Sequence, residues 1–348
     1  MRRILAVLSL LAVAATALPA CADPGGGRDT VTLVTHDSFV MSKPVQRAFE
    51  RSTGLRLRIL RSGDAGAALN QVILTKDRPL GDAFFGVDNT LIARALEARI
   101  FVRHTPRGAA ALPTDLVIDR TGHVTSVDYG DVCVNYDVEY FSAGEERALP
   151  STLDDLAEPR FASALVVEDP TTSSTGLAFM LASIARFGDG WLDWWSDLRA
   201  GGVTVVDGWE QAYNAEFSGG AGEGDSPLVV SYATSPAAEV LYADPRPASA
   251  PTGNLDRTCF RQIETVGVLR NAANPAGARA LVDFMLGERF QADVPLGMFV
   301  HPVRPGTPVP PEFTRYGGRP TEPFSVPPAE IARNLDRWLE QWNATVLR

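Results

Sequence analysis

The sequence predicts an α/β fold in which strands alternate with helices. Short apolar runs recur along the chain, and between them lie longer stretches whose apolar residues follow helical spacing. Small polar residues, glycines and prolines stand where a strand is expected to turn into the next helix. The 348 residues, 45% hydrophobic and 21% charged, are enough for about two domains with buried cores.

The first hundred residues are typical of consecutive strand–helix–strand units. A helix begins at Pro44 and ends at Gly54, and Leu55, Leu57 and Ile59 then alternate with arginines in a strand. The expected elements, in order, are a strand at 31–34, a helix at 44–53, a strand at 55–59, a helix around 69–73, a strand at 83–87 and a helix at 90–98.

A second region begins near residues 128–130. Its expected elements are strands at 165–167, 203–206, 228–232 and 263–269, and helices at 175–187, 191–198, from about 210, and at 275–286. Proline-rich chain at 302–328 is expected to run over the surface, and an amphipathic helix between Ile331 and Val346 closes the chain. We find no internal repeat and no second hydrophobic span, which argues against a channel or permease.

The N-terminus is typical of an exported lipoprotein. Arg2 and Arg3 precede an apolar run at 4–17, shorter than the roughly 20 residues that span a bilayer. Small residues then lead to Cys21, an arrangement that resembles the bacterial lipobox, in which the cysteine is acylated. We expect a signal peptide at 1–20 and a flexible tether at 21–30. The mature protein is then extracytoplasmic and lipid-anchored to the cell membrane, or periplasmic if Cys21 carries no lipid.

Charge and cysteine content limit the classes of partner. The formal charge is −10, and it becomes more negative once Arg2 and Arg3 are removed. An acidic surface disfavours nucleic acid and adsorption to anionic lipid, and it is compatible with a cationic ligand. Outside the cell, Cys133 and Cys259 can form a disulfide or remain two buried thiols. The three cysteines and four histidines have no metal-ligand spacing, so we expect no metal site.

No motif for catalysis stands out. The chain lacks a Gly-x-Ser-x-Gly elbow, an HExxH helix and a P-loop. Asp154 and Asp155 fall in a helical stretch whose acids are expected to face solvent, and residues 224–226 are expected to form a glycine-rich turn. We therefore expect a protein that is not an enzyme.

Three strand-to-helix turns carry small polar residues that suit ligand binding. Backbone N–H groups and the dipole at a helix start favour an anion, and hydroxyl side chains add donors, although a serine or threonine there can be a plain N-cap. Turns of this kind converge at the carboxyl ends of parallel strands. The residues predicted at these turns are Asp64, Ala65, Ser173, Ser174, Tyr232, Ala233, Thr234 and Ser235.

Aromatic and acidic residues lie beside these turns. Trp209, Tyr213, Tyr232 and Phe299 are candidates for binding a flat or cationic group, with core packing as the alternative. Asp37 and Asp88 follow expected strands, where they suit an amino group or a positive ring, or cap a helix.

Several short segments, in this order and spacing, resemble the thiamine-binding proteins of ABC importers. This family is a branch of the two-lobed periplasmic-binding-protein class (type II). The resemblance runs from about Val31 to Trp342. The matching segments are 35–39, 86–89, 128–130, 169–170 with 172–173, 208–213 and 231–236.

The resemblance implies two α/β lobes joined by crossing strands, with the ligand cleft between the lobes. Lobe 1 would comprise 31–130 and 264–315, lobe 2 would comprise 131–263, and 316–348 would form a C-terminal surface segment and helix. The family's ligand residues fall on Asp64, Ala65, Ser173, Ser174, Trp209 and Tyr232 to Ser235. The implied ligand is thiamine or its mono- or diphosphate, with no cofactor, and the implied partners are an ABC permease and its ATPase. We expect a monomer.

Departures from the family pattern leave the preference among thiamine esters open. His36 stands where the family often has tyrosine, Phe299 where it often has tryptophan, and Thr175 where it has proline. A polyamine, ferric iron or a phosphonate on the same scaffold is the alternative, although iron versions need paired tyrosines and Tyr232 has no tyrosine next to it. Thiamine-degrading enzymes of related fold need a nucleophilic cysteine, whereas Cys133 and Cys259 lie in apolar surroundings.

Overall fold

The computed structural model describes residues 29–144, 147–318 and 320–348. Within them a single ten-stranded mixed sheet has the strand order β2-β1-β3-β9-β5-β8-β6-β7, with β10 beside β5 and β4 beside β9. The expected signal peptide, Cys21 and most of the tether lie outside the described residues. Among the described residues, no helix combines the length and the apolar content that a membrane crossing requires.

The part of the molecule built on the strands β1, β2 and β3 is called lobe 1 below. The parallel strands β1 (Thr30–Thr35), β2 (Arg56–Arg61) and β3 (Ala83–Asp88) alternate with α1 (Lys43–Thr53) and α2 (Ala65–Leu74), as the sequence predicts. Gly54 ends α1 at a φ of 73°, a left-handed conformation that glycine adopts without strain. The other elements are α3 (Ile92–Glu97), β4 (Phe101–Val102), η1 (Ala109–Ala111), α11 (Pro275–Met285), α12 (Glu288–Gln291), α13 (Val294–Gly297) and β10 (His301–Pro302).

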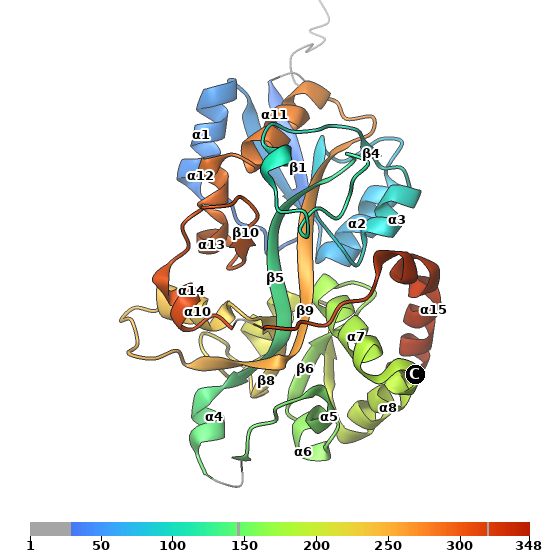
Figure 1. Ribbon diagram of the computed structural model, residues 1–348, viewed down its shortest axis with the longest axis vertical. Helices are drawn as coiled ribbons and strands as arrows, with labels where there is room; N and C mark the ends of the chain where they lie inside the picture. The colour runs from blue at the N-terminus through green and yellow to red at the C-terminus, as the bar shows by residue number, and fades with distance from the viewer. Residues whose placement is uncertain (1–28, 145–146, 319) are drawn as a thin grey trace, which may run out of the picture.

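Two long antiparallel strands, β5 (Thr125–Asp137) and β9 (Thr252–Leu269), run through both parts of the molecule (Figure 1). The resemblance implied crossing strands between the lobes, but the local pattern indicated only the end of β9, because polar residues on both faces of these strands interrupt the apolar pattern that marks a strand. Cys133 of β5 and Cys259 of β9 are joined by a disulfide. The paired strands form the connection between the two lobes.

The part of the molecule built on the strands β6, β7 and β8 is called lobe 2. Its strands β6 (Leu165–Glu168), β7 (Thr204–Val206) and β8 (Leu228–Tyr232) are parallel to one another, and β8 pairs with β5. The main helices are α7 (Ser174–Phe187), α8 (Trp191–Gly201) and α10 (Ser235–Tyr242). Shorter elements are α4 (Val138–Ser142), α5 (Leu153–Leu156), α6 (Pro159–Ala162), η3 (Gly188–Gly190), α9 (Trp209–Gln211) and the π-helix η4 (Ala212–Glu216).

The C-terminal chain connects the two lobes on their outer side. After the short α14 (Pro311–Arg315), the chain reaches α15 (Pro328–Val346), which packs against α8 of lobe 2 and α3 of lobe 1 (Figure 1). The helix buries Trp338 and Trp342, and the ring of Trp342 lies 5.4 Å from that of Trp195 in α8. The apolar stripe predicted between Ile331 and Val346 is therefore the buried face of α15.

Candidate ligand-binding cleft

A cavity of about 210 Å³ lies between the two lobes. It receives side chains from the loop after β1, from β9 and the segment before β10 in lobe 1, and from α9, η4 and the end of β8 in lobe 2. Four of the residues that the sequence predicts for the site line it: Trp209, Tyr232, Ser235 and Phe299. The other lining residues are His36, Ser38, Val40, Glu210, Asn214, Glu264, Gly297, Met298 and Val300.

A second cavity, of about 440 Å³, lies on the other face of β5 and β9 beneath the proline-rich chain. Its charged side chains include Asp131 and Arg261, which are paired with each other at 2.5 Å between Oδ1 and Nε. The cavity between the lobes is smaller, but it holds the predicted aromatic residues. We therefore take the smaller cavity as the candidate site.

The aromatic side of the cavity is held in place by hydrogen bonds and stacking. The indole N–H of Trp209 donates to Ser231 Oγ at 2.9 Å, and the Tyr232 hydroxyl donates to Gln262 Oε1 at 2.8 Å. Tyr213 does not line the cavity; its ring stacks on Trp209 with centroids 5.2 Å apart and planes 14° apart. Fixed rings of this kind suit a flat ligand, because little side-chain entropy is lost on binding.

Phe299 closes the cavity from lobe 1. Its backbone has a φ of 57°, which is rare for a residue other than glycine. Its carbonyl accepts a hydrogen bond from the Thr234 hydroxyl, and its ring meets the edge of Tyr242 at 5.3 Å. Contacts with lobe 2 therefore hold the ring in this position.

Asp64 connects the two lobes next to the cavity without lining it. As the N-cap of α2, its Oδ1 accepts from the backbone N–H of Ala65 at 2.5 Å. The same carboxylate accepts from the N–H of Trp209 at 3.0 Å and from that of Ser174 at 3.5 Å. Burial raises the pKa of Asp64, and the Trp209 N–H and the nearby His36 oppose that shift. Two predicted turns therefore meet at one carboxylate.

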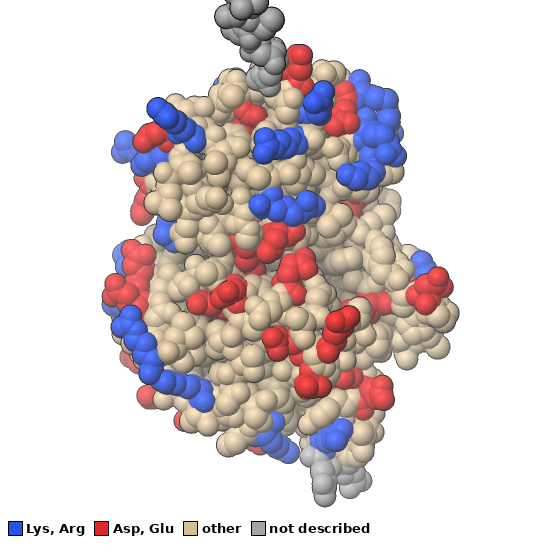
Figure 2. Space-filling model, turned by 180° about the vertical axis from the view of Figure 1, so that it is seen from behind, with Lys and Arg blue, Asp and Glu red and all other residues tan. Residues whose placement is uncertain are grey.

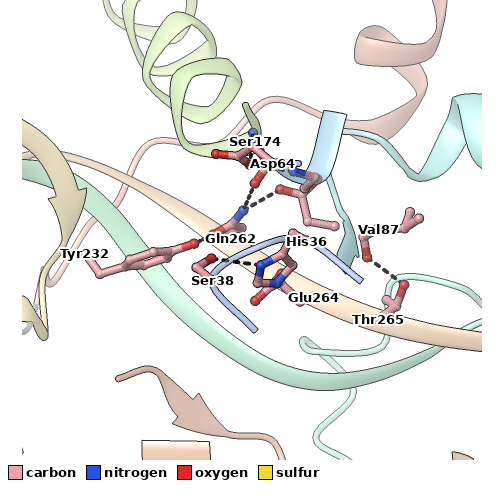
Figure 3. A network of polar contacts seen from close by, with 11 residues as sticks. His36, Ser38, Asp64, Val87, Ser174, Tyr232, Gln262, Glu264 and Thr265 are labelled. Carbon is pink, nitrogen blue, oxygen red and sulfur yellow. Dashed lines mark hydrogen bonds and ion pairs between the residues drawn. The ribbon is translucent and has the colours of Figure 1, made fainter. Parts of the chain in front are cut away.

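The two serines in the turn before α7 have different roles: one caps the helix and the other belongs to a polar network. Ser173 is the N-cap and accepts from Gly176 N–H at 3.4 Å, whereas Ser174 Oγ accepts from Gln262 Nε2 at 2.9 Å (Figure 3). Gln262 Nε2 also donates to Asp88 Oδ2 at 2.7 Å. The other oxygen of Asp88 accepts from the N–H groups of Thr90 and Leu91, so Asp88 caps this turn. Burial raises the pKa of Asp88 to about 6.

The turn after β8 lies closer to the cavity. Ser235 begins α10 and lines the cavity, and its Oγ is 2.9 Å from Ser231 Oγ. Thr234 is buried, and its hydroxyl donates the hydrogen bond to the Phe299 carbonyl described above. Ala233 packs beside Cys133 and Cys259, away from the cavity. Of this turn, therefore, only Tyr232 and Ser235 reach the cavity.

Sequence reasoning missed a charged group made by His36, Asp128 and Glu264. Both His36 and Glu264 line the cavity, and His36 Nε2 lies 3.2 Å from Glu264 Oε1 (Figure 3). Asp128 and Glu264 are opposite one another on β5 and β9, and Asp128 is fully buried. Within the described chain, the carboxylate oxygens of Asp128 have no hydrogen-bond donor. Burial first, and then the charge of Glu264, raise the pKa of Asp128 well above its ordinary value.

Pattern reasoning could not place these three residues together, because they come from three distant segments. The only sequence signals were the polar residues inside the strands and the histidine at a position where the family often has tyrosine. Asp37, which the sequence predicts for the site, does not line the cavity; its charge contributes to raising the pKa values of His36 and Glu210.

The cavity is acidic. Glu210 and Glu264 line it, and no lysine or arginine is among the lining residues. Acidic side chains also gather across the middle of the face seen in Figure 2. Within the described residues, no three His, Cys, Asp or Glu side chains are grouped to hold a metal ion. An acidic cavity with aromatic sides is suited to a flat organic cation.

The profile of the bacterial extracellular solute-binding proteins matches residues 79–334. The chain belongs to this family. A thiamine-binding periplasmic protein of Brucella suis is 29% identical over 355 residues, which cover 98% of this chain and 99% of the relative. The solved structure of a periplasmic thiamin-binding protein matches with a TM-score of 0.77 and 25% identity, over 92% of this chain and 97% of that one.

The comparisons confirm the predicted two-lobed periplasmic-binding-protein fold of type II. The solved structure of an iron-bound protein from Pseudomonas aeruginosa shares this fold with a TM-score of 0.66 and 17% identity, over 91% of this solute-binding protein and 99% of that chain. An extracytoplasmic solute-binding role is confirmed as well. The family and these relatives are named for binding, which agrees with the prediction of a protein that is not an enzyme.

Proposed function

We propose that this protein captures thiamine, and thiamine phosphates, outside the cytoplasm and delivers them to an ABC permease and its ATPase. The observation that carries the proposal is the acidic cavity between the lobes, with Trp209, Tyr232 and Phe299 around it. Thiamine has a cationic thiazolium ring and a flat aminopyrimidine, which match those two properties. The relatives named for thiamine binding support the same ligand.

The proposed ligand contacts divide by position. Trp209, Tyr232 and Phe299 contact the rings, and Ser235 with the start of α10 binds the hydroxyl or phosphate end. Asp64, Ala65, Ser173, Ser174, Ala233 and Thr234 form the turns next to these residues. Tyr213 stacks on Trp209, Asp88 is linked to Tyr232 through Gln262, and Asp37 contributes negative charge near His36 and Glu210. A phosphate would lie in an acidic cavity without lysine or arginine, so we propose that free thiamine binds more tightly than its diphosphate.

The lobe boundaries are proposed at 130/131 and 263/264. They are supported by the change of pairing partner along the two long strands. β5 pairs with β10 of lobe 1 up to Tyr129 and with β8 of lobe 2 from Val132, and β9 pairs with β3 of lobe 1 from Glu264. Lobe 1 is then 31–130 with 264–315, lobe 2 is 131–263, and 316–348 is the C-terminal segment. We further propose a monomer.

A lipid anchor on Cys21 is proposed from the N-terminal sequence, since a tether keeps a binding protein near its permease. Mass spectrometry of the mature N-terminus tests it. The expected result is a diacylglyceryl modification on Cys21 at the first position. An unmodified N-terminus elsewhere refutes the anchor and leaves ligand binding untouched.

Calorimetric titration of the purified mature protein with thiamine tests the function. We expect a dissociation constant below about 10 µM, equivalent to roughly −7 kcal/mol. Competition with thiamine diphosphate is expected to show weaker binding of the diphosphate. Spermidine and ferric citrate, run as parallel ligands, represent the alternative cargoes. Binding of either one, without binding of thiamine, refutes the proposal.

A further inference from the structure

The strongest unassigned feature of the cavity is a contact between an imidazole and a carboxylate that both face the ligand space. His36 and Glu264 line the cavity, and their Nε2 and Oε1 atoms are 3.2 Å apart. Their side chains are only 10% and 7% exposed. A cation that enters this cavity therefore meets a carboxylate that already has a positively charged neighbour whenever His36 is protonated.

We propose that His36 is a specificity-determining residue whose imidazolium competes with the cationic ligand for Glu264, so that binding of the ligand releases one proton from His36 to the solvent. This inference rests on the proposed function and deepens it. No bond other than the N–H bond of the imidazolium breaks. The positive charge lost from His36 is replaced by that of the ligand.

The neighbours of Glu264 explain why one cation, and not two, is expected beside it. The carboxyl of Asp128 lies opposite Glu264, and burial and the charge of Glu264 raise the pKa of Asp128 well above its ordinary value, which favours the protonated form that can donate to Glu264. The pair of carboxyl groups then holds one negative charge. Either the imidazolium or the ligand neutralises that charge, and both together would leave a buried excess of positive charge.

The histidine can exist in either charge state at this position. Its Nδ1 lies 2.8 Å from Ser38 Oγ, and a hydroxyl can accept from, or donate to, a ring nitrogen. Burial lowers the pKa of His36, but the charge of Glu264, at an ion-pair distance of 3.2 Å, and then the charges of Asp64 and Asp37 raise the pKa above its ordinary value. The imidazole can therefore lose its proton when a ligand takes over Glu264.

Other titratable groups surround the contact between His36 and Glu264. Their effect on the pH dependence of binding must be distinguished from that of His36. They come from every neighbouring segment and are Asp37, Asp64, Asp88, Asp128, Glu210 and Tyr232. A pH effect on affinity is therefore informative only when it is compared between variants. His104 provides a matched control, because its Nε2 is paired with Asp283 Oδ1 at 3.0 Å but does not line the cavity.

The direction in which thiamine affinity changes with pH follows from the linkage between proton release and ligand binding. The pKa of His36 is raised in the free protein and falls when a cation occupies Glu264. Between the two pKa values, one proton leaves per ligand bound, and the dissociation constant falls by about tenfold per pH unit as the pH rises. Above the raised pKa of the free protein, affinity no longer changes with pH.

The experiment is calorimetric titration with thiamine from about pH 5 to about pH 8.5, in buffers of different ionisation enthalpy, which counts the protons released. The parallel ligand is an analogue in which an uncharged thiophene replaces the thiazolium. Because both ligands keep the aminopyrimidine, protonation of that ring is common to them. We expect release approaching one proton for thiamine between the pKa values of the bound and the free protein, falling to about half a proton at the free-state pKa, and none from His36 for the analogue.

Two variants decide the source of the proton. His36→Gln is expected to remove the release and to flatten the pH dependence, while His104→Gln keeps both at their wild-type values. Release that persists in His36→Gln, or thiamine binding without any release in the wild-type protein, overturns the inference and leaves the proposed function standing. Failure of thiamine to bind at any pH overturns the proposed function itself.

Discussion

Asp64 of lobe 1 and Trp209 of lobe 2 are joined across the cleft by a hydrogen bond of 3.0 Å from the Trp209 backbone N–H to Asp64 Oδ2. Gly208 favours this approach, because a Cβ there would lie 3.0 Å from the same oxygen, a tight contact that would require Asp64 to shift. The contact links the start of α2 to the ring that lines the cavity. We therefore expect the relative position of the lobes and the position of Trp209 to be coupled through Asp64.

Substitution Asp64→Ala is expected to favour the open arrangement of the lobes. It removes the acceptor for two N–H groups of lobe 2, at a cost of about 1–3 kcal/mol, which corresponds to roughly 5- to 150-fold weaker thiamine binding. Small-angle scattering of the free protein is expected to give a larger radius of gyration than the wild type. Asp64→Asn, which keeps an acceptor oxygen, is expected to fall between the two. Equal scattering and affinity in all three proteins would contradict the coupling.

Substitution Trp209→Ala tests the aromatic side of the cavity. Loss of the ring is expected to weaken thiamine binding by about 0.5–2 kcal/mol, or roughly 2- to 30-fold. Trp209→Phe keeps a ring but loses the bond to Ser231, so a smaller loss is expected. The uncharged thiophene analogue is the control ligand, and its affinity is expected to change less than that of thiamine. A larger change for the analogue would place the thiazolium away from Trp209.

Glu168 is expected to make stability depend on pH. It is fully buried, and within the described chain its carboxylate oxygens have no hydrogen-bond partner. Burial, and then the charge of Asp64, raise its pKa well above 4.5. The stabilisation from its protonated form is therefore complete below about pH 4.5 and is lost as the pH rises through the raised pKa.

Glu168→Gln is accordingly expected to raise the free energy of unfolding at pH 8 by about 1–3 kcal/mol, with the gain vanishing toward pH 4.5. Thermal unfolding across this pH range measures it. The exposed Glu97→Gln serves as the control and is expected to show no such trend. A variant less stable than the wild type at pH 8 would show that Glu168 has a required partner as an anion.

The disulfide is expected to matter for stability and not for the ligand. Cys133 and Cys259 are separated by 126 residues, and neither lines the cavity. Replacing both by serine is expected to lower the free energy of unfolding by about 2–5 kcal/mol. Thiamine affinity, measured at a temperature where the variant is folded, is expected to stay at the wild-type value. Loss of affinity in a folded variant would assign the disulfide a role in shaping the cleft.

The order of elements could be predicted from local sequence because each one has a local cause. Proline and glycine mark the two ends of α1, and alternation marks β2, where Leu57 is buried and its neighbours are not. The turns before α2, α7 and α10 were predicted for the same reason, since caps and small polar residues act within a few positions. Local pattern did not predict the pairing of β5 with β9, because pairing over more than a hundred residues leaves no local periodicity; only the family resemblance implied crossing strands.

For this protein, the sequence alone determined the α/β class, the three turns and the aromatic candidates, because these depend on spacing along the chain. Only the tertiary structure decided which of these residues line the cavity, namely Trp209, Tyr232, Ser235 and Phe299. Asp64 and Ser174 do not line it, and their side chains accept hydrogen bonds from other residues of the protein. The contact between His36 and Glu264 also exists only in the folded protein. The crossing strand β9 brings Glu264 beside the loop after β1, and no pattern within either segment records that distance.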